Sequence, residues 1–178
     1  IADSQPGSNQ IVWSGDGQLA FIGMRDGSAE IAVWDGQVVT PILRQAMIIN
    51  SPTWSSDNRL SFAAVLREEQ NRDIYVWDSG KLTNLSASPA DDYGQVWSAD
   101  GRLSYMSFQG SRWQLNVWEA DLRNKRTENA VYALNPAWSS DGQLAFVSIE
   151  GRLGDIYVWD NRTLFNLTHT PNLNELDP

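Results

Sequence analysis

The chain has 178 residues, of which 42% are apolar, and this length and composition suffice for one domain with a packed core. Its formal net charge of −9 makes nucleic acid and anionic membrane surfaces poor partners, and the absence of Cys excludes disulfides and Cys-based zinc sites. No run of 18 apolar residues occurs in the sequence, so we expect no membrane insertion. The chain begins with Ile1 and lacks a signal-peptide pattern, which indicates a mature chain or a segment of a longer one.

Two short motifs recur in phase along the chain. The first reads Trp-Ser-x-Asp-(Gly/Asn)-x-Leu-(Ala/Ser)-(Phe/Tyr), and it is followed each time by a second motif that ends in Val-Trp-(Asp/Glu). The first motif starts at Trp13, Trp54, Trp97 and Trp138, and the second places its Trp at Trp34, Trp77, Trp118 and Trp159. Four copies at a spacing of 41 to 43 residues indicate a repeat architecture.

Each repeat contains the pattern of four short strands. In chain order, the first repeat predicts a strand ending at Trp13, a tight Ser-x-Asp-Gly turn, and a second strand over residues 18–22. The third strand is clearest in the second repeat, where residues 73–77 are β-branched and aromatic, and a more polar fourth strand follows over residues 81–85. No segment shows a sustained helical period, so the chain is predicted to be all-β.

Four strands in about forty residues are typical of one blade of a β-propeller. The sequence therefore predicts a single domain over residues 1–178, with four tandem four-stranded antiparallel blades at approximately residues 10–50, 51–93, 94–134 and 135–178. These are repeats 1 to 4 below. The eight repeat Trp are expected to pack between blades, and Trp113 is the ninth Trp, outside the repeat register.

The motifs resemble a known family. Residues 54–57 (Trp-Ser-Ser-Asp), 73–78 (Asp-Ile-Tyr-Val-Trp-Asp) and 82–85 (Leu-Thr-Asn-Leu) are similar to the WD-like repeat of TolB-type propellers, as are their counterparts in repeat 4. The resemblance implies the fold but not the function, because many proteins carry such blades. Repeat 3 departs from the pattern, since Arg123-Asn124-Lys125-Arg126-Thr127 replaces its Leu-Thr element.

The resemblance also implies six blades, whereas the chain contains four repeats. Three arrangements stay open: a closed four-bladed ring, an eight-bladed ring of two chains, or part of a longer propeller. Asp177 aligns with Gln10 at the start of the next repeat, and an open four-blade arc would expose two apolar faces. We favour the two-chain ring, which makes a homodimer the expected assembly.

No catalytic constellation is visible in the sequence, so we expect no enzyme activity and no cofactor. The nucleophile pattern Gly-x-Ser-x-Gly is absent, and His169, the only His, lies in a polar segment after a strand. The recurrent Asp residues of both motifs are interpreted as turn residues. Asp92 and Asp177 precede a first strand and are weak candidates for a metal at the mouth of a central channel, but Gln10, Ser51 and Asn135 at related places leave few ligands.

The loops between second and third strands differ most among the repeats, and each holds at least one Arg. Because connections alternate between the two ends of a blade, these loops share one face with the links between blades. Arg and aromatic residues dominate protein interfaces, and function is concentrated on loops held by a rigid scaffold. The candidate protein-binding residues are Arg25, Arg67, Arg72, Tyr93, Arg112, Trp113 and Arg152.

Two functions remain open at this stage. The first is a protein- or peptide-binding or scaffold module that uses one loop face. The second is an accessory propeller of a larger, peptidase-like enzyme, gating a catalytic domain that lies outside this chain. A bacterial, extracytoplasmic location is favoured, since the chain lacks Cys, and a cytoplasmic location stays open.

Overall fold

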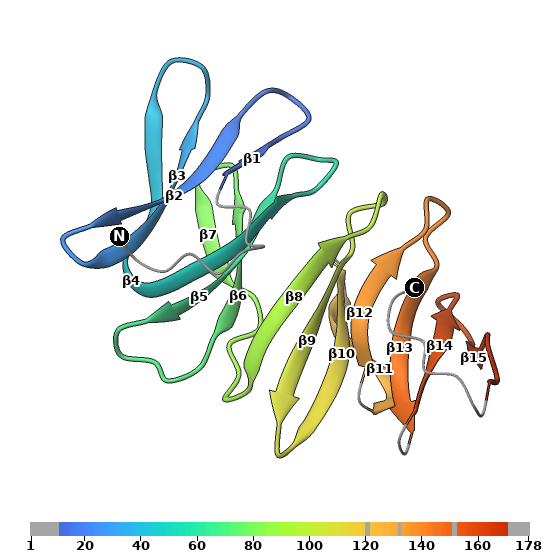
Figure 1. Ribbon diagram of the computed structural model, residues 1–178. Coiled ribbons are helices and arrows are strands. Elements are labelled where there is room, and N and C mark those ends of the chain that lie inside the picture. Colours follow the sequence, from blue (N-terminus) through green and yellow to red (C-terminus); the bar gives the residue numbers. More distant parts are fainter. Residues whose placement is uncertain (1–10, 120–121, 132, 151–152, 171–178) are drawn as a thin grey trace. The chain divides into compact units, whose positions relative to one another are not determined.

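The computed structural model describes residues 11–119, 122–131, 133–150 and 153–170 (Figure 1). Within these ranges it consists of strands and turns, so the prediction of an all-β chain is confirmed. No helix in this part of the chain is long and apolar enough to cross a membrane. The contacts divide the chain into two compact units, one ending at Pro89 and the other beginning at Ala90.

Unit 1 contains one antiparallel sheet of seven strands, in which each strand pairs with its neighbours in the sequence. The strands are β1 (Ile11–Trp13), β2 (Leu19–Arg25), β3 (Ser28–Trp34), β4 (Val39–Trp54), β5 (Leu60–Leu66), β6 (Asp73–Asp78) and β7 (Lys81–Asn84). The sequence predicts two four-stranded sheets here, but β4 serves both repeats. Its first half pairs with β3 and its second half pairs with β5.

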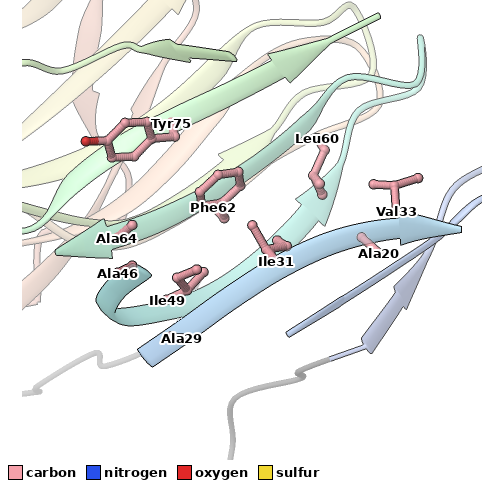
Figure 2. Close-up of a cluster of buried hydrophobic side chains, with 10 residues drawn as sticks. All are labelled: Ala20, Ala29, Ile31, Val33, Ala46, Ile49, Leu60, Phe62, Ala64 and Tyr75. Carbon is pink, nitrogen blue, oxygen red and sulfur yellow. The ribbon is translucent and has the colours of Figure 1, made fainter. Parts of the chain in front are cut away.

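Ala46 is the residue at which β4 changes partner. It lies opposite Ala29 of β3 and Leu66 of β5, and its side chain is fully buried. The preceding residue, Gln45, has a φ of 63°, and register shifts on both sides mark an irregular, bulged segment. The chain bends at this segment but stays extended on either side, so one long strand replaces two. Figure 2 shows the ribbon of β4 bending sharply at Ala46.

Unit 2 contains two antiparallel sheets, each with the four strands that the sequence predicts for one repeat. The first is formed by β8 (Asp91–Trp97), β9 (Leu103–Gln109), β10 (Arg112–Glu119) and β11 (Leu122–Val131). The second is formed by β12 (Ala133–Trp138), β13 (Leu144–Glu150), β14 (Leu153–Trp159) and β15 (Leu164–Asn166).

The core of unit 1 lies along strands β2 to β6. Phe62 stacks on Tyr75 with ring centroids 5.7 Å apart, and Ile31 and Leu60 are fully buried beside them. Figure 2 shows ten side chains of this cluster. Unit 2 repeats the arrangement in its second sheet, where Phe146 is stacked on Tyr157. The same strand positions of repeats 2 and 4 therefore build the two cores.

The Ser-x-Asp turn has one geometry in all four repeats. The hydroxyl of Ser14 donates a hydrogen bond to Asp16 Oδ1 at 2.5 Å, and the backbone N–H of Gln18 donates to the Ser14 hydroxyl. The same pairs of bonds recur at Ser55, Ser98 and Ser139. The interpretation of these carboxylates as turn residues is confirmed by this repeated geometry.

The Trp residues of the first motif join neighbouring repeats within each unit. Trp54 Nε1 donates to the carbonyl of Val12 at 3.1 Å, and Trp138 Nε1 donates to the equivalent carbonyl, that of Val96, at 3.2 Å. Trp13 differs from them, because its side chain is 58% exposed. The other seven repeat Trp are half-buried. The prediction that the eight repeat Trp are buried between blades is therefore wrong for Trp13, whose motif is the same but whose surroundings are not.

A positive φ recurs three residues before the Trp in repeats 2 to 4. Ser51, Gly94 and Asn135 have φ values of 53°, 66° and 50°, and a register shift accompanies each of them. This is a β-bulge in the first strand, and it favours Gly, Asn and other small polar residues. Ser51 and Asn135 thus have a backbone role at the places considered above for a metal. Gln10 lies outside the described residues.

Candidate functional site

Loops of unit 1 form a hollow where β4 changes partner. It has a volume of about 480 Å³, within the range of ligand sites in proteins. Three segments contribute to it: the β2–β3 hairpin tip, the bulge of β4 and the start of the β5–β6 loop. The lining residues are Arg25, Asp26, Ser28, Glu30, Arg44, Gln45 and Arg67.

The strand register explains why these three segments meet. Ala46 lies opposite both Ala29 and Leu66, so the residues next to these partners converge on one point. Ser28 precedes Ala29, and Arg67 follows Leu66. Asp26 and Gly27 form the hairpin tip, with φ values of 50° and 74° that fit a two-residue type I′ turn.

The charges of the hollow are only partly paired. Arg25 Nε lies 3.1 Å from Glu30 Oε2, and Arg67 donates from Nη2 to the hydroxyl of Ser28, a buried residue. Among the described residues, no carboxylate lies within ion-pair distance of Arg44 or Arg67. Three guanidinium groups therefore line the hollow with two carboxylates, so it is locally cationic in a chain of net charge −9.

Two of the predicted binding residues, Arg25 and Arg67, are brought together here. Arg44 was not predicted. A signal for it was available, since the link between repeats shares a face with the second-to-third strand loops, and Arg44 lies in such a link. Arg72 lies just before β6, half-buried and with contacts of its own, and it does not line the hollow.

In unit 2, Tyr93 of β8 and Trp113 of β10 lie close together on the sheet formed by β8 to β11. The Trp113 ring is 4.8 Å from the Tyr93 ring, edge to face, and 4.5 Å from the Phe108 ring. Trp113 is half-buried and packs against the buried cluster of this unit. This placement supports a packing role for Trp113. Arg112 is the first residue of β10 and Arg152 lies outside the described residues, so neither side chain is placed.

The metal candidates do not form a site in the described part of the chain. Asp92 lies within β8, opposite Ser107, rather than before the strand, and it is fully buried. Asp177 lies outside the described residues. The described ranges contain no group of three or more His, Asp or Glu residues that could hold a metal ion.

His169 has a structural explanation. It is exposed, has a φ of 46°, and donates its backbone N–H to Asn166 Oδ1 at 3.0 Å. Ala87 has the equivalent conformation after Asn84 in repeat 2. The residue is therefore part of the turn that leaves the last strand of its repeat.

A carboxylate that the sequence analysis did not single out anchors the same turn. Asp73 is buried and accepts hydrogen bonds from Asn84 Nδ2 at 2.7 Å and from the Ser86 hydroxyl at 3.2 Å. In repeat 4 the Asn166 side chain likewise donates to Asp155, and this bond is the largest of the contacts that lower the pKa of Asp155. Both Asn residues belong to Asn-Leu-(Ser/Thr) segments, so their side chains serve the fold.

Two of the hairpin-turn carboxylates, Asp16 and Asp100, have a lowered pKa, which favours their charged form. The hydrogen bond from the Ser14 hydroxyl lowers the pKa of Asp16, and the bond from the Arg102 side chain lowers the pKa of Asp100. A general acid at neutral pH needs a raised pKa instead. These groups therefore have the electrostatics of turn residues, and the cationic hollow is the strongest candidate site in the described residues.

No protein-family model matches the chain, and no curated protein matches it. Several solved structures do. TolB from Acinetobacter baumannii superposes with a TM-score of 0.59 at 19% identity, covering 90% of this chain and 43% of that one. The β-propeller domain of the Trilobed protease from Pyrococcus furiosus gives 0.64 at 18% identity, covering 90% and 57%. An acylaminoacyl peptidase from Pyrococcus horikoshii gives 0.70 at 13% identity, covering 94% and 28%.

These similarities establish the fold, which is that of a TolB-type β-propeller, as the sequence motifs predict. The chain spans about half the length of the first two matched structures. Their identities are too low to carry a function from one protein to another.

Proposed function

We propose that this chain is a non-catalytic propeller module that binds a protein or peptide at the end of its sheets where the β2–β3 and β5–β6 loops lie. The hollow between these loops is the observation that carries the proposal. It gathers Arg25, Arg44 and Arg67, none of which belongs to the repeated motifs that build the fold.

The test is site-specific photocrosslinking in an extract of the source organism. A photoreactive residue at Asp26, on the hairpin tip beside the hollow, is expected to crosslink one discrete partner. The matched control is the same residue at Ser79, in the β6–β7 turn at the opposite end of the sheet. Equal crosslinking at both positions, or none at Asp26, would contradict the proposal.

A second candidate is an accessory propeller of a peptidase-like enzyme. It is favoured by the structural similarity to the propeller domain of the Trilobed protease and to the acylaminoacyl peptidase. This candidate requires a hydrolase domain, with its Gly-x-Ser-x-Gly segment, elsewhere in the same gene. Sequencing the complete gene decides between the two candidates.

We further propose four four-stranded blades that are completed into a ring by a second copy of the chain. In this arrangement β4 supplies the last strand of the first blade and the first strand of the second. The hydrogen bonds from Trp54 and Trp138 to the preceding repeats support the proposal, because Trp13 has the same motif and an exposed side chain. A bacterial, extracytoplasmic location is part of the same proposal, in line with the TolB-type fold and the absence of Cys.

A further inference from the structure

The charge distribution around the hollow of unit 1 identifies a ligand chemistry. Glu30 already neutralises Arg25, and Arg67 contacts a neutral hydroxyl. Arg44 is exposed and contacts no carboxylate among the described residues. Two guanidinium groups thus face the same space without an ion-pair partner, since Glu30 pairs with Arg25 and Asp26, the other lining carboxylate, pairs with neither of them. A bound anion would supply the partner.

Arg44 and Arg67 differ from the Arg residues that stabilise the turns of the fold. Arg59 and Arg102 each pair with the turn Asp two residues before them, at 2.9 Å, and are almost fully buried. Arg44 and Arg67 make no such pair in the described structure and lie in segments that differ among the repeats. Both line the same hollow, where their like charges repel one another, which a purely structural role does not explain.

The backbone beside Arg44 is also unusual. Gln45 has a φ of 63°, a conformation that residues other than Gly, Asn and Asp seldom adopt. A residue in this conformation persists only where the surrounding structure maintains the strain. Here the pairing of Ala46 with two strands fixes the backbone, and Arg44 thereby lines the same hollow as Arg67.

We propose that the hollow binds the carboxylate groups of an acidic peptide segment, with Arg44 and Arg67 as the principal ligands; this inference rests on the proposed binding function. A guanidinium group matches a carboxylate with two parallel hydrogen bonds, which gives both strength and orientation. The net charge of −9 disfavours a long polyanion such as nucleic acid, whereas a short acidic segment meets mainly the local cationic surface.

The proposal is tested with a fluorescein-labelled hexaglutamate peptide and a matched hexaglutamine peptide, by fluorescence anisotropy on the complete chain. Hexaglutamate is expected to bind saturably and hexaglutamine not to bind. Arg44→Gln and Arg67→Gln should each weaken binding about fivefold to tenfold, the loss expected for one partly exposed charge-assisted contact. The matched control is Arg162→Gln, which makes the same charge change at an exposed turn of unit 2.

Three outcomes would overturn the proposal. They are an absence of hexaglutamate binding, equal weakening by Arg162→Gln, and binding of inorganic phosphate at the hollow without any peptide binding. Circular dichroism of each variant checks that the fold is retained. The outcome is separable from that of the proposed function, because hexaglutamate binding alongside failed crosslinking at Asp26 would contradict only the latter.

Discussion

Gly142 illustrates how one residue satisfies two requirements at once. Its φ is 84°, which favours glycine, and a Cβ atom placed there would lie 2.6 Å from Arg102 Nη2. Arg102 reaches this position because it pairs with Asp100, donates to the Gly142 carbonyl at 2.8 Å and stacks over the Trp138 ring. The close approach therefore couples the turns of repeats 3 and 4.

Gly17 provides the matched comparison for this glycine. It has the same place in repeat 1 and a φ of 89°, but no atom lies within 4 Å of the Cβ position. Gly17→Ala should lower the free energy of unfolding by about 1 kcal/mol through backbone strain alone. Gly142→Ala should lower the free energy of unfolding by about 1 kcal/mol more than Gly17→Ala, because the Arg102 side chain must move and lose some of its hydrogen bonds. Urea unfolding measures both, and equal losses would mean that Arg102 moves without cost.

At the scale of elements, hydrogen bonds from Trp indole N–H groups to backbone carbonyls connect neighbouring repeats. Trp138 Nε1 donates to the Val96 carbonyl and also to the Ser104 hydroxyl at 3.0 Å, and Ser104 is fully buried. Trp138→Phe keeps an aromatic ring but removes the donor, which should destabilise the protein by about 1 to 2 kcal/mol.

The control for this substitution is Trp34→Phe. Trp34 is also half-buried, and its indole N–H makes no hydrogen bond within the described part of the chain. Trp34→Phe removes the same ring atoms as Trp138→Phe but no hydrogen bond, so it should lower the thermal unfolding midpoint clearly less. A Trp34 variant as unstable as the Trp138 variant would show that ring packing, and not the hydrogen bond, joins the repeats.

The strands and turns were predictable from sequence because both motifs carry local chemistry. Ser14 and Asp16, for example, fix their turn through bonds between residues two and four positions apart. The continuity of β4 was not predictable in the same way. Gln45 is not a residue type that marks a positive φ, and its conformation depends on the pairing of Ala46 with two strands that are distant in sequence.

The candidate site was predictable in part for the same reason. Arg25 and Arg67 stand out in the sequence because they lie in loops that the repeat does not explain. Arg44 joins them only through the strand register, which a single repeat pattern does not contain. Trp113 stands outside the repeat register, a position compatible with a partner contact or with packing, and in the structure its ring packs against Tyr93 and Phe108. Its role as a contact residue stays a prediction.

At the scale of the whole molecule, Trp13 and Ile11 form an exposed apolar face, with 58% and 62% of their surfaces accessible. In repeats 2 and 4 the equivalent Trp lies against a carbonyl of the preceding repeat. The position in repeat 4 that corresponds to Val12 and Val96 is Ala137, whose carbonyl a second copy would offer to Trp13. We therefore expect a head-to-tail dimer in sedimentation equilibrium.

Trp13→Arg should convert this dimer to a monomer, because a charge replaces the apolar contact and the indole donor. Val38→Arg is the control, since Val38 is equally exposed, at 59%, but lies in the β3–β4 turn. A wild-type chain that stays monomeric at high concentration, or a dimer that withstands Trp13→Arg, would rule out this assembly.

The continuous strand β4 affects which repeats of the protein can unfold locally. In most repeat proteins, stability is a sum of terms for single repeats and for the interfaces between neighbours, and terminal repeats can open alone. Repeats 1 and 2 are joined through the continuous strand β4, and Ala46 pairs with a strand of each repeat, so opening either repeat removes one backbone partner of Ala46. We therefore expect hydrogen exchange to be more strongly coupled between repeats 1 and 2 than between repeats 3 and 4, because β11 and β12 of unit 2 lie in separate sheets.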